Sequence, residues 1–149
     1  MSDKKVKKSE RGQGLVEFAI GLLVLLYLIV VIADGARALY TYLSMRDAVQ
    51  EGAIYASIHP ADTSEIENRV RNASNLLSGL GGDIAITIAP TTSGKYCMGT
   101  TGGSPHGITI SINYPDFPLA MPFMSTLIGS QSVAISASVT DTILSPLCP

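Results

Sequence analysis

The chain has 149 residues, a formal net charge of −2 and 46% apolar residues. Its length favours one folded domain. Charge is unevenly divided, because residues 1–12 carry a net charge of +3 and residues 13–149 carry −5. The acidic remainder argues against a phosphate-binding surface of clustered lysine and arginine, so we expect no nucleic-acid partner.

A long apolar segment follows the short basic leader of residues 1–12. From Leu15 to Ala33 there are nineteen residues with one charged side chain, Glu17. A helix of that length measures roughly 28 Å, enough to cross a hydrocarbon core of about 30 Å. Lipid is therefore an expected partner of this segment. Because basic flanks stay in the cytoplasm, we expect the rest of the chain to lie outside it.

The same helix is predicted to continue beyond the membrane as a stalk. Asp34 and Arg37 stand three positions apart and are expected to pair on its surface. Pro60 is the first residue that cannot continue the helix, which should therefore end near His59. One predicted face is apolar and must be covered by the head or a neighbour; it comprises Ala38, Tyr42, Met45, Val49, Ala53 and Ala56. The opposite, polar face comprises Arg37, Thr41, Ser44, Asp47 and Glu51.

A second, short helix is predicted after Pro60. Asp62 can cap it and Glu65 follows three residues later, as in a capping box. An apolar stripe recurs at helical spacing through Ile66, Val70, Ala73 and Leu77. Gly79, Gly81 and Gly82 then end the helix.

The hydrophobic period changes from 3.6 to 2 after these glycines. Three segments alternate apolar and polar residues, around Ile84–Ile88, Ile108–Tyr114 and Val133–Val139. This alternation is typical of antiparallel strands with one wet face. We therefore predict an α+β fold, in which a small three-stranded antiparallel sheet packs on the long helix and the short helix. The predicted organisation is a leader (1–12), a transmembrane helix (13–34), a stalk helix (35–59) and a head (60–149).

Two long connections separate the predicted strands. The first runs from Pro90 to Gly107. The second, Pro115 to Gln131, is rich in apolar residues and forms either a short helix after Pro122 that tucks into the core or an exposed contact surface. Cys97 and Cys148 are the only cysteines. Outside the cytoplasm they can form a disulfide worth about 4 kcal/mol, or remain as two free thiols.

Glu17 is the most informative single residue, because an acid at the mouth of a membrane helix is costly and usually has a role. If the chain is cut after Gly12, Gln13 carries a free ammonium at the positive end of a helix, where a cation is unfavourable. Glu17 lies four residues along on the same face and can neutralise that amine or a neighbour's. The alternative is an interfacial glutamate that reaches back to water.

These residues resemble a known family. Gly12, Gln-Gly-Leu-Val, Glu17 and Phe18 are similar to the cleavage motif of type IV prepilin-like proteins. The continuation resembles the TadE-like minor pseudopilins of tight-adherence (Tad/Flp) pilus systems. The residues that carry this likeness are Arg11-Gly12, Val16-Glu17-Phe18-Ala19, Asp34-Gly35-Ala36-Arg37, Leu43, Ala48 and Glu51-Gly52-Ala53.

The resemblance implies a maturation route in a bacterial cytoplasmic (inner) membrane. A prepilin peptidase would cut between Gly12 and Gln13. Glu17 and Phe18 would set the register with an adjacent subunit, and the helix from Leu15 to Ala33 would enter a pilus or its initiating complex. The implied partners are other pilins and pseudopilins, the prepilin peptidase and the inner-membrane assembly platform, and the final location is the cell-surface pilus. The head is large for the major pilin of such systems, which favours a minor subunit.

Two other functional classes remain open. The apolar segment can act as a secretory signal, with Val31 and Ala33 placed for cleavage before Asp34, or as an uncleaved anchor for a binding domain. No nucleophile-and-base set indicates an enzyme. His59 and His106 lack nearby acids and cysteines in the sequence, so we expect neither a metal site nor a cofactor.

Overall fold

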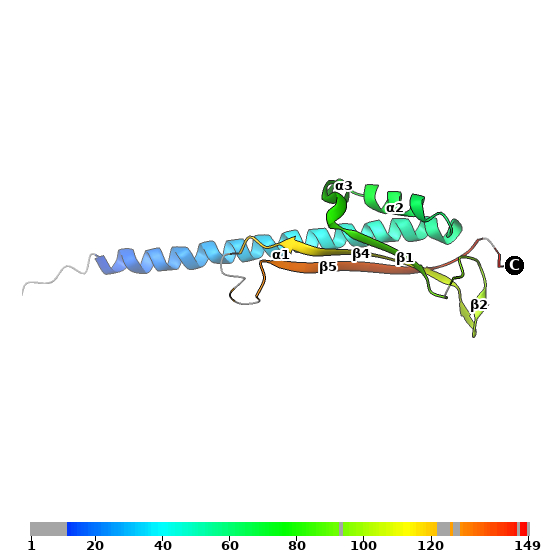
Figure 1. Cartoon of the computed structure of the whole chain (residues 1–149). Helices are drawn as coiled ribbons and strands as arrows, with labels where there is room; N and C mark the ends of the chain where they lie inside the picture. Colours follow the sequence, from blue (N-terminus) through cyan, green and yellow to red (C-terminus); the bar gives the residue numbers. More distant parts are fainter. Residues whose placement is uncertain (1–11, 93, 122–125, 127–128, 146, 149) are drawn as a thin grey trace, which may run out of the picture.

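The structure is a computed structural model that describes residues 12–92, 94–121, 126, 129–145 and 147–148. One long helix, α1 (Gln13–Ile58), runs through the molecule, and its C-terminal half is covered by a small head. Its N-terminal half projects beyond the head (Figure 1). The C-terminus lies at the opposite end of the molecule from the start of α1. The predicted α+β class and long N-terminal helix are confirmed.

The helix α1 is continuous over 46 residues, which corresponds to roughly 69 Å. It ends one residue before the predicted end, where the backbone N–H of His59 donates to Tyr55 O and Pro60 follows. Gly35 does not interrupt it. The membrane-length part and the stalk are thus one continuous helix.

Two short helices, not one, follow α1. Helix α2 (Thr63–Asn72) begins as predicted, because Asp62 Oδ1 accepts from the backbone N–H of Glu65 at 3.3 Å. The predicted continuation through Ala73 is wrong. Ser74 Oγ accepts from the backbone N–H of Leu77 and so starts a separate helix, α3 (Asn75–Leu80). A 3₁₀ turn, η2 (Gly81–Asp83), then leads into the sheet.

The sheet has the strand order β1-β4-β5, and both pairings are antiparallel. Its strands are β1 (Ala85–Pro90), β4 (Gly107–Pro118) and β5 (Ser132–Thr142). Strand β4 continues past its predicted end at Tyr114, through an irregularity between Tyr114 and Phe117. The second predicted connection is therefore shorter than Pro115–Gln131. Of its proposed helix after Pro122, Thr126 is described and is helical, whereas residues 122–125 and 127–128 lie outside the described residues.

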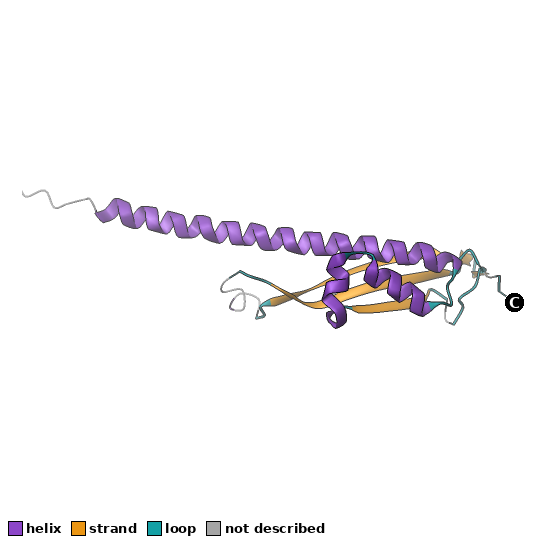
Figure 2. Ribbon diagram, turned by 90° about the horizontal axis from the view of Figure 1, so that it is seen from above, coloured by secondary structure: helices purple, strands orange, loops and turns teal. Residues whose placement is uncertain are grey.

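The helices cover one face of this sheet, and α2 and α3 lie beside α1 (Figure 2). Small hydroxylated side chains such as Thr87, Ser111 and Ser138 occupy one row of the other face. Thr41, which was predicted on the polar face of the stalk, is buried instead, and Tyr42 from the predicted apolar face is exposed. The core draws on α1 (Met45, Ala48, Val49, Ala53, Ala56), the short helices (Ile66, Val70, Leu77), the sheet (Ile108, Ile110, Ile112, Tyr114, Phe117, Ala137) and the residues that flank β1 and β5 (Ile84, Ile143).

The end of the head farthest from the start of α1 is held by several separate contacts. A two-stranded hairpin that the sequence did not predict, β2 (Thr100–Thr101) with β3 (Ser104–Pro105), lies in the first long connection. The C-terminal tail returns to α1, because the backbone N–H of Leu144 donates to Ser57 O at 2.7 Å. Met98 and Leu147 also form a parallel bridge.

Candidate functional site

The start of α1 presents the predicted cleavage residues on an open surface. Gly12 precedes the helix without a side-chain cap, and Gln13 is the first helical residue. Gln13 and Glu17 lie one turn apart, and both are exposed. Side chains at this spacing face each other, with about 5–6 Å between their Cβ atoms. A new amine at Gln13 would therefore lie within reach of the Glu17 carboxylate.

The apolar part of α1 is exposed within this chain. By length and composition α1 is a helix able to cross a membrane, and none of its most apolar window is buried within the protein. Leu15 is 72% exposed and Phe18 is 69% exposed. Side chains this apolar are stable only against lipid or other apolar chains. The predicted transmembrane segment from Leu15 to Ala33 is thus free to contact either.

Asp34 connects this segment to the head. Its side chain is buried, with Oδ2 accepting from the backbone N–H of Met121 at 2.8 Å and Oδ1 lying 3.3 Å from Arg37 Nη1. Arg37 in turn lies over the ring of Phe117 at 5.5 Å. The Asp34–Arg37 pair was predicted correctly, but its placement on the surface was wrong for Asp34. The sequence did not indicate Met121 or Phe117 as partners.

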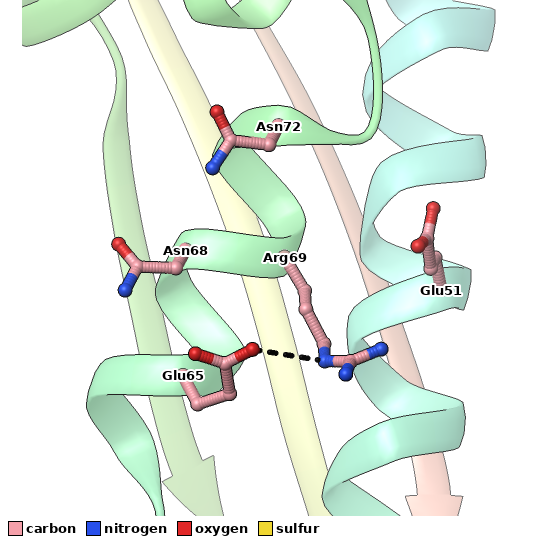
Figure 3. Close-up of a pocket in the computed structure, with 5 residues that line it drawn as sticks. All are labelled: Glu51, Glu65, Asn68, Arg69 and Asn72. Carbon is pink, nitrogen blue, oxygen red and sulfur yellow. Dashed lines mark ion pairs between the residues drawn. The ribbon is translucent and has the colours of Figure 1, made fainter.

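Glu51 and Gly52 have different environments although they are adjacent. Glu51 is exposed and lines a polar cleft between α1 and α2 together with Glu65, Asn68, Arg69 and Asn72 (Figure 3). In this cleft Arg69 Nε lies 3.3 Å from Glu65 Oε1, and the guanidinium stacks over Tyr55 at 4.1 Å.

Gly52 is buried. A Cβ added there would overlap Val70 Cγ2 and lie 3.3 Å from Ile110 Cδ1. Gly52 is therefore the point of close approach between α1, α2 and the sheet.

Cys97 and Cys148 form the predicted disulfide, with their Cα atoms 5.0 Å apart. His106, which is distant from Cys148 in the sequence, lies near it in the fold, with Nδ1 3.5 Å from Cys148 Sγ. This ring is buried and donates from Nδ1 to Cys97 O at 3.1 Å, since a carbonyl can only accept. Nε2 then accepts from the Thr101 hydroxyl at 2.8 Å.

The three side chains Cys97, His106 and Cys148 place their ligand atoms within 4.8 Å of one another. Metal binding requires thiolates, and in the structure both sulfurs are joined to each other. The arrangement therefore acts as a structural cross-link, in which His106 holds the backbone of Cys97 in place. No sequence pattern indicated this role, because His106 is nine residues from Cys97 and 42 from Cys148.

Comparison with known proteins finds a family likeness in the N-terminal helix. No curated protein and no solved structure matches the chain. The model of the TadE-like protein family matches residues 12–53. This match lies almost wholly within α1 and covers Gly12, Glu17, the Asp34–Arg37 pair and Gly52; it includes none of the head. The N-terminal part of the chain is therefore similar to TadE-like proteins, a likeness consistent with a protein of the Tad pilus system.

Proposed function

We propose that the chain is a minor pseudopilin without enzymatic activity, cleaved between Gly12 and Gln13 and assembled through α1 into a tight-adherence pilus or its initiating complex. The observation that carries this proposal is the TadE-like match, which begins at Gly12 and continues along one helix. The geometry at the start of α1 supports it, since Gly12 is exposed next to the first helical residue.

Glu17 has an assembly role in this proposal. After cleavage, the ammonium of Gln13 lies at the positive end of α1, where it is destabilising. In the membrane, the exposed Glu17 carboxylate neutralises that amine or the amine of an adjacent subunit. The adjacent Phe18, also exposed, packs on the neighbouring helix. Glu17 and Phe18 thereby set the register between subunits.

The proposed location follows from the charge of the leader. Residues 1–12 remain in the cytoplasm, where a prepilin peptidase acts, and the head lies outside. The inner-membrane assembly platform then moves the mature helix into the filament, and its bare apolar surface exchanges lipid for the helices of other pilins. The disulfide between Cys97 and Cys148 agrees with a head outside the cytoplasm.

A signal peptide removed before Asp34 is the competing reading. Two observations favour the pseudopilin. Helix α1 continues without a break across Ala33 and Asp34, and the Asp34 carboxylate is buried and bonded to the backbone of Met121. A cut there would place a new terminus inside a packed contact between the helix and the head.

The N-terminal residue of the mature protein tests the proposal. We expect intact-mass measurement of the full chain, expressed together with a prepilin peptidase, to give a product that begins at Gln13. Gly12→Ala should lose most of this processing. Gly14→Ala is the matched control, because Gly14 is equally exposed and a Cβ there meets nothing within 4 Å. A product that begins at Asp34, or an intact N-terminus, would overturn the proposal.

A further inference from the structure

The three-stranded sheet has two open edges. Among the described residues, no other strand pairs with the outer edge of β1 or of β5. Such edges present unpaired N–H and C=O groups and are usually blocked by lysine, proline or a bulge. In β5 the only charge is Asp141, and in β1 the only proline is Pro90, both near the same end of the sheet. The remainder of both edges carries no such protection.

The apolar layer beneath the sheet is incomplete at these same edges. Ile110 and Ile112 in the central strand are fully buried against the helices. Ile88 on β1 and Val139 on β5, which occupy the same row as Ile110, are only partly buried. Another strand beside either edge would bury them further. Within the described part of the chain, both edges therefore lack a hydrogen-bonding partner and full lateral apolar cover.

The direction of the strands decides which neighbouring strand can supply both the hydrogen bonds and the apolar cover. Strands β1 and β5 are each antiparallel to β4, so they run in the same direction. Two copies inserted in one membrane with the same orientation would place β5 of one copy parallel to β1 of the next. By contrast, antiparallel pairing of β5 with β5 would invert one copy, which a shared membrane forbids.

The register is also compatible with this pairing. Within one sheet, Ala85, Asn113 and Ser136 form one row, and Ile88, Ile110 and Val139 form another. Copies at equal height would therefore bring Ser136 beside Ala85, and Val139 beside Ile88, with matching faces. An axial shift by two residues preserves the faces, because side chains alternate with a period of two.

We propose that β5 of one copy pairs with β1 of the next, so that one sheet continues between copies that share a membrane. The contact joins two different surfaces and can be repeated from copy to copy. This inference rests on the proposed function, because it requires copies inserted with one common orientation. It identifies a second copy of this chain as a partner of the head, in addition to the helix contacts.

Pairwise cysteine cross-linking in membranes tests the pairing. Two full-length chains with different tags are co-expressed, one with Ala85→Cys and the other with Ser136→Cys, and the membranes are mildly oxidised. Adjacent strands lie about 4.8 Å apart, within disulfide reach. In one chain, positions 85 and 136 are separated by two strand spacings, about 9.6 Å, which is too far to bridge. Chains that carry Ser138→Cys or Thr140→Cys in place of Ser136→Cys detect copies that are shifted along the strand.

The matched control replaces Ser136→Cys with Asn113→Cys. Asn113 is exposed and lies in the same row, but it belongs to the central strand. We expect about tenfold more mixed dimer with a β5 cysteine than with this control, because only β5 comes within disulfide distance of a neighbouring β1. No excess with position 136, 138 or 140 would overturn the inference, as would a homodimer of the Ser136→Cys chain that exceeds the mixed dimer.

Cleavage after Gly12 is measured by intact mass in the same membranes. Cleavage without the mixed dimer would refute the sheet pairing and leave the proposed function standing. A mixed dimer without cleavage would support the pairing and refute the pseudopilin proposal.

Discussion

The backbone N–H of Met121 donates to Asp34 Oδ2 across 2.8 Å, joining residues 87 positions apart in the chain. Asp34 is the first residue after the apolar run, and Met121 follows β4. Because the carboxylate is buried, this bond is protected from water and contributes more than an exposed one. The head is therefore attached to α1 at the level where the helix would leave the membrane.

Asp34→Ala should loosen this attachment. The substitution leaves the Met121 N–H without its acceptor, and an unsatisfied buried group costs about 1–3 kcal/mol. We expect faster amide exchange at Met121 and faster proteolysis between β4 and β5. Asp34→Asn is the control, because its side-chain oxygen can still accept, and it should show a smaller change. Unchanged exchange at Met121 in Asp34→Ala would contradict the structural role given to this bond.

Gly52→Ala should destabilise the head by about 1–3 kcal/mol, because the added methyl overlaps Val70 and packs tightly on Ile110. Thermal unfolding of the detergent-solubilised full chain measures the effect. Gly35→Ala is the matched control in the same helix, since its Cβ meets nothing within 4 Å. That control should be neutral or stabilising by up to about 1 kcal/mol.

The Gly52→Ala effect should also depend on Val70. Combining it with Val70→Ala removes the overlapping side chain, so the double variant should lose less stability than the sum of the two single variants. Strict additivity would show that Val70 is not the group that excludes a side chain at position 52.

Removal of the disulfide should weaken the end of the head that carries the C-terminus. Cys97→Ser with Cys148→Ser opens a loop spanning 51 positions, with an expected loss of about 4 kcal/mol. The hydrogen bond that the backbone N–H of Cys148 donates to Met98 O should break as well. A thiol reductant should lower the melting temperature of the native chain and leave that of the double variant unchanged. Equal melting temperatures of the native chain and the double variant would refute a stabilising role.

Glu17→Ala separates processing from assembly. Glu17 is exposed near the start of α1, so we expect normal folding and normal cleavage after Gly12. Without an acid to neutralise the new amine, filament entry should fall severalfold or more, as measured by the amount of chain in sheared surface filaments. Glu17→Asp should restore part of the loss. Equal filament content in Glu17→Ala and the native chain would argue against the register role of Glu17.

Local patterns were sufficient to predict most of the architecture. The uninterrupted apolar run and Pro60 define the extent of α1, because both act through local backbone and solvent preferences. The alternation around Ile86, Ile110 and Ala137 predicts three strands and their inner faces for the same reason. The break at Ser74 was missed because a single hydroxyl capping a new turn competes with an otherwise helical stripe.

The contacts that connect these elements depend on distance in space, and no local pattern encodes them. The spacing of Asp34 and Arg37 in the chain predicts that they can pair, but the bond of buried Asp34 to Met121 forms only when the segment after β4 reaches α1. In the same way, His106 meets Cys97 and Cys148 only when the tail folds back along the head. Helix and strand periods follow from each residue's neighbours in the chain. The contact of Met121 with α1, by contrast, forms only when the whole head has folded.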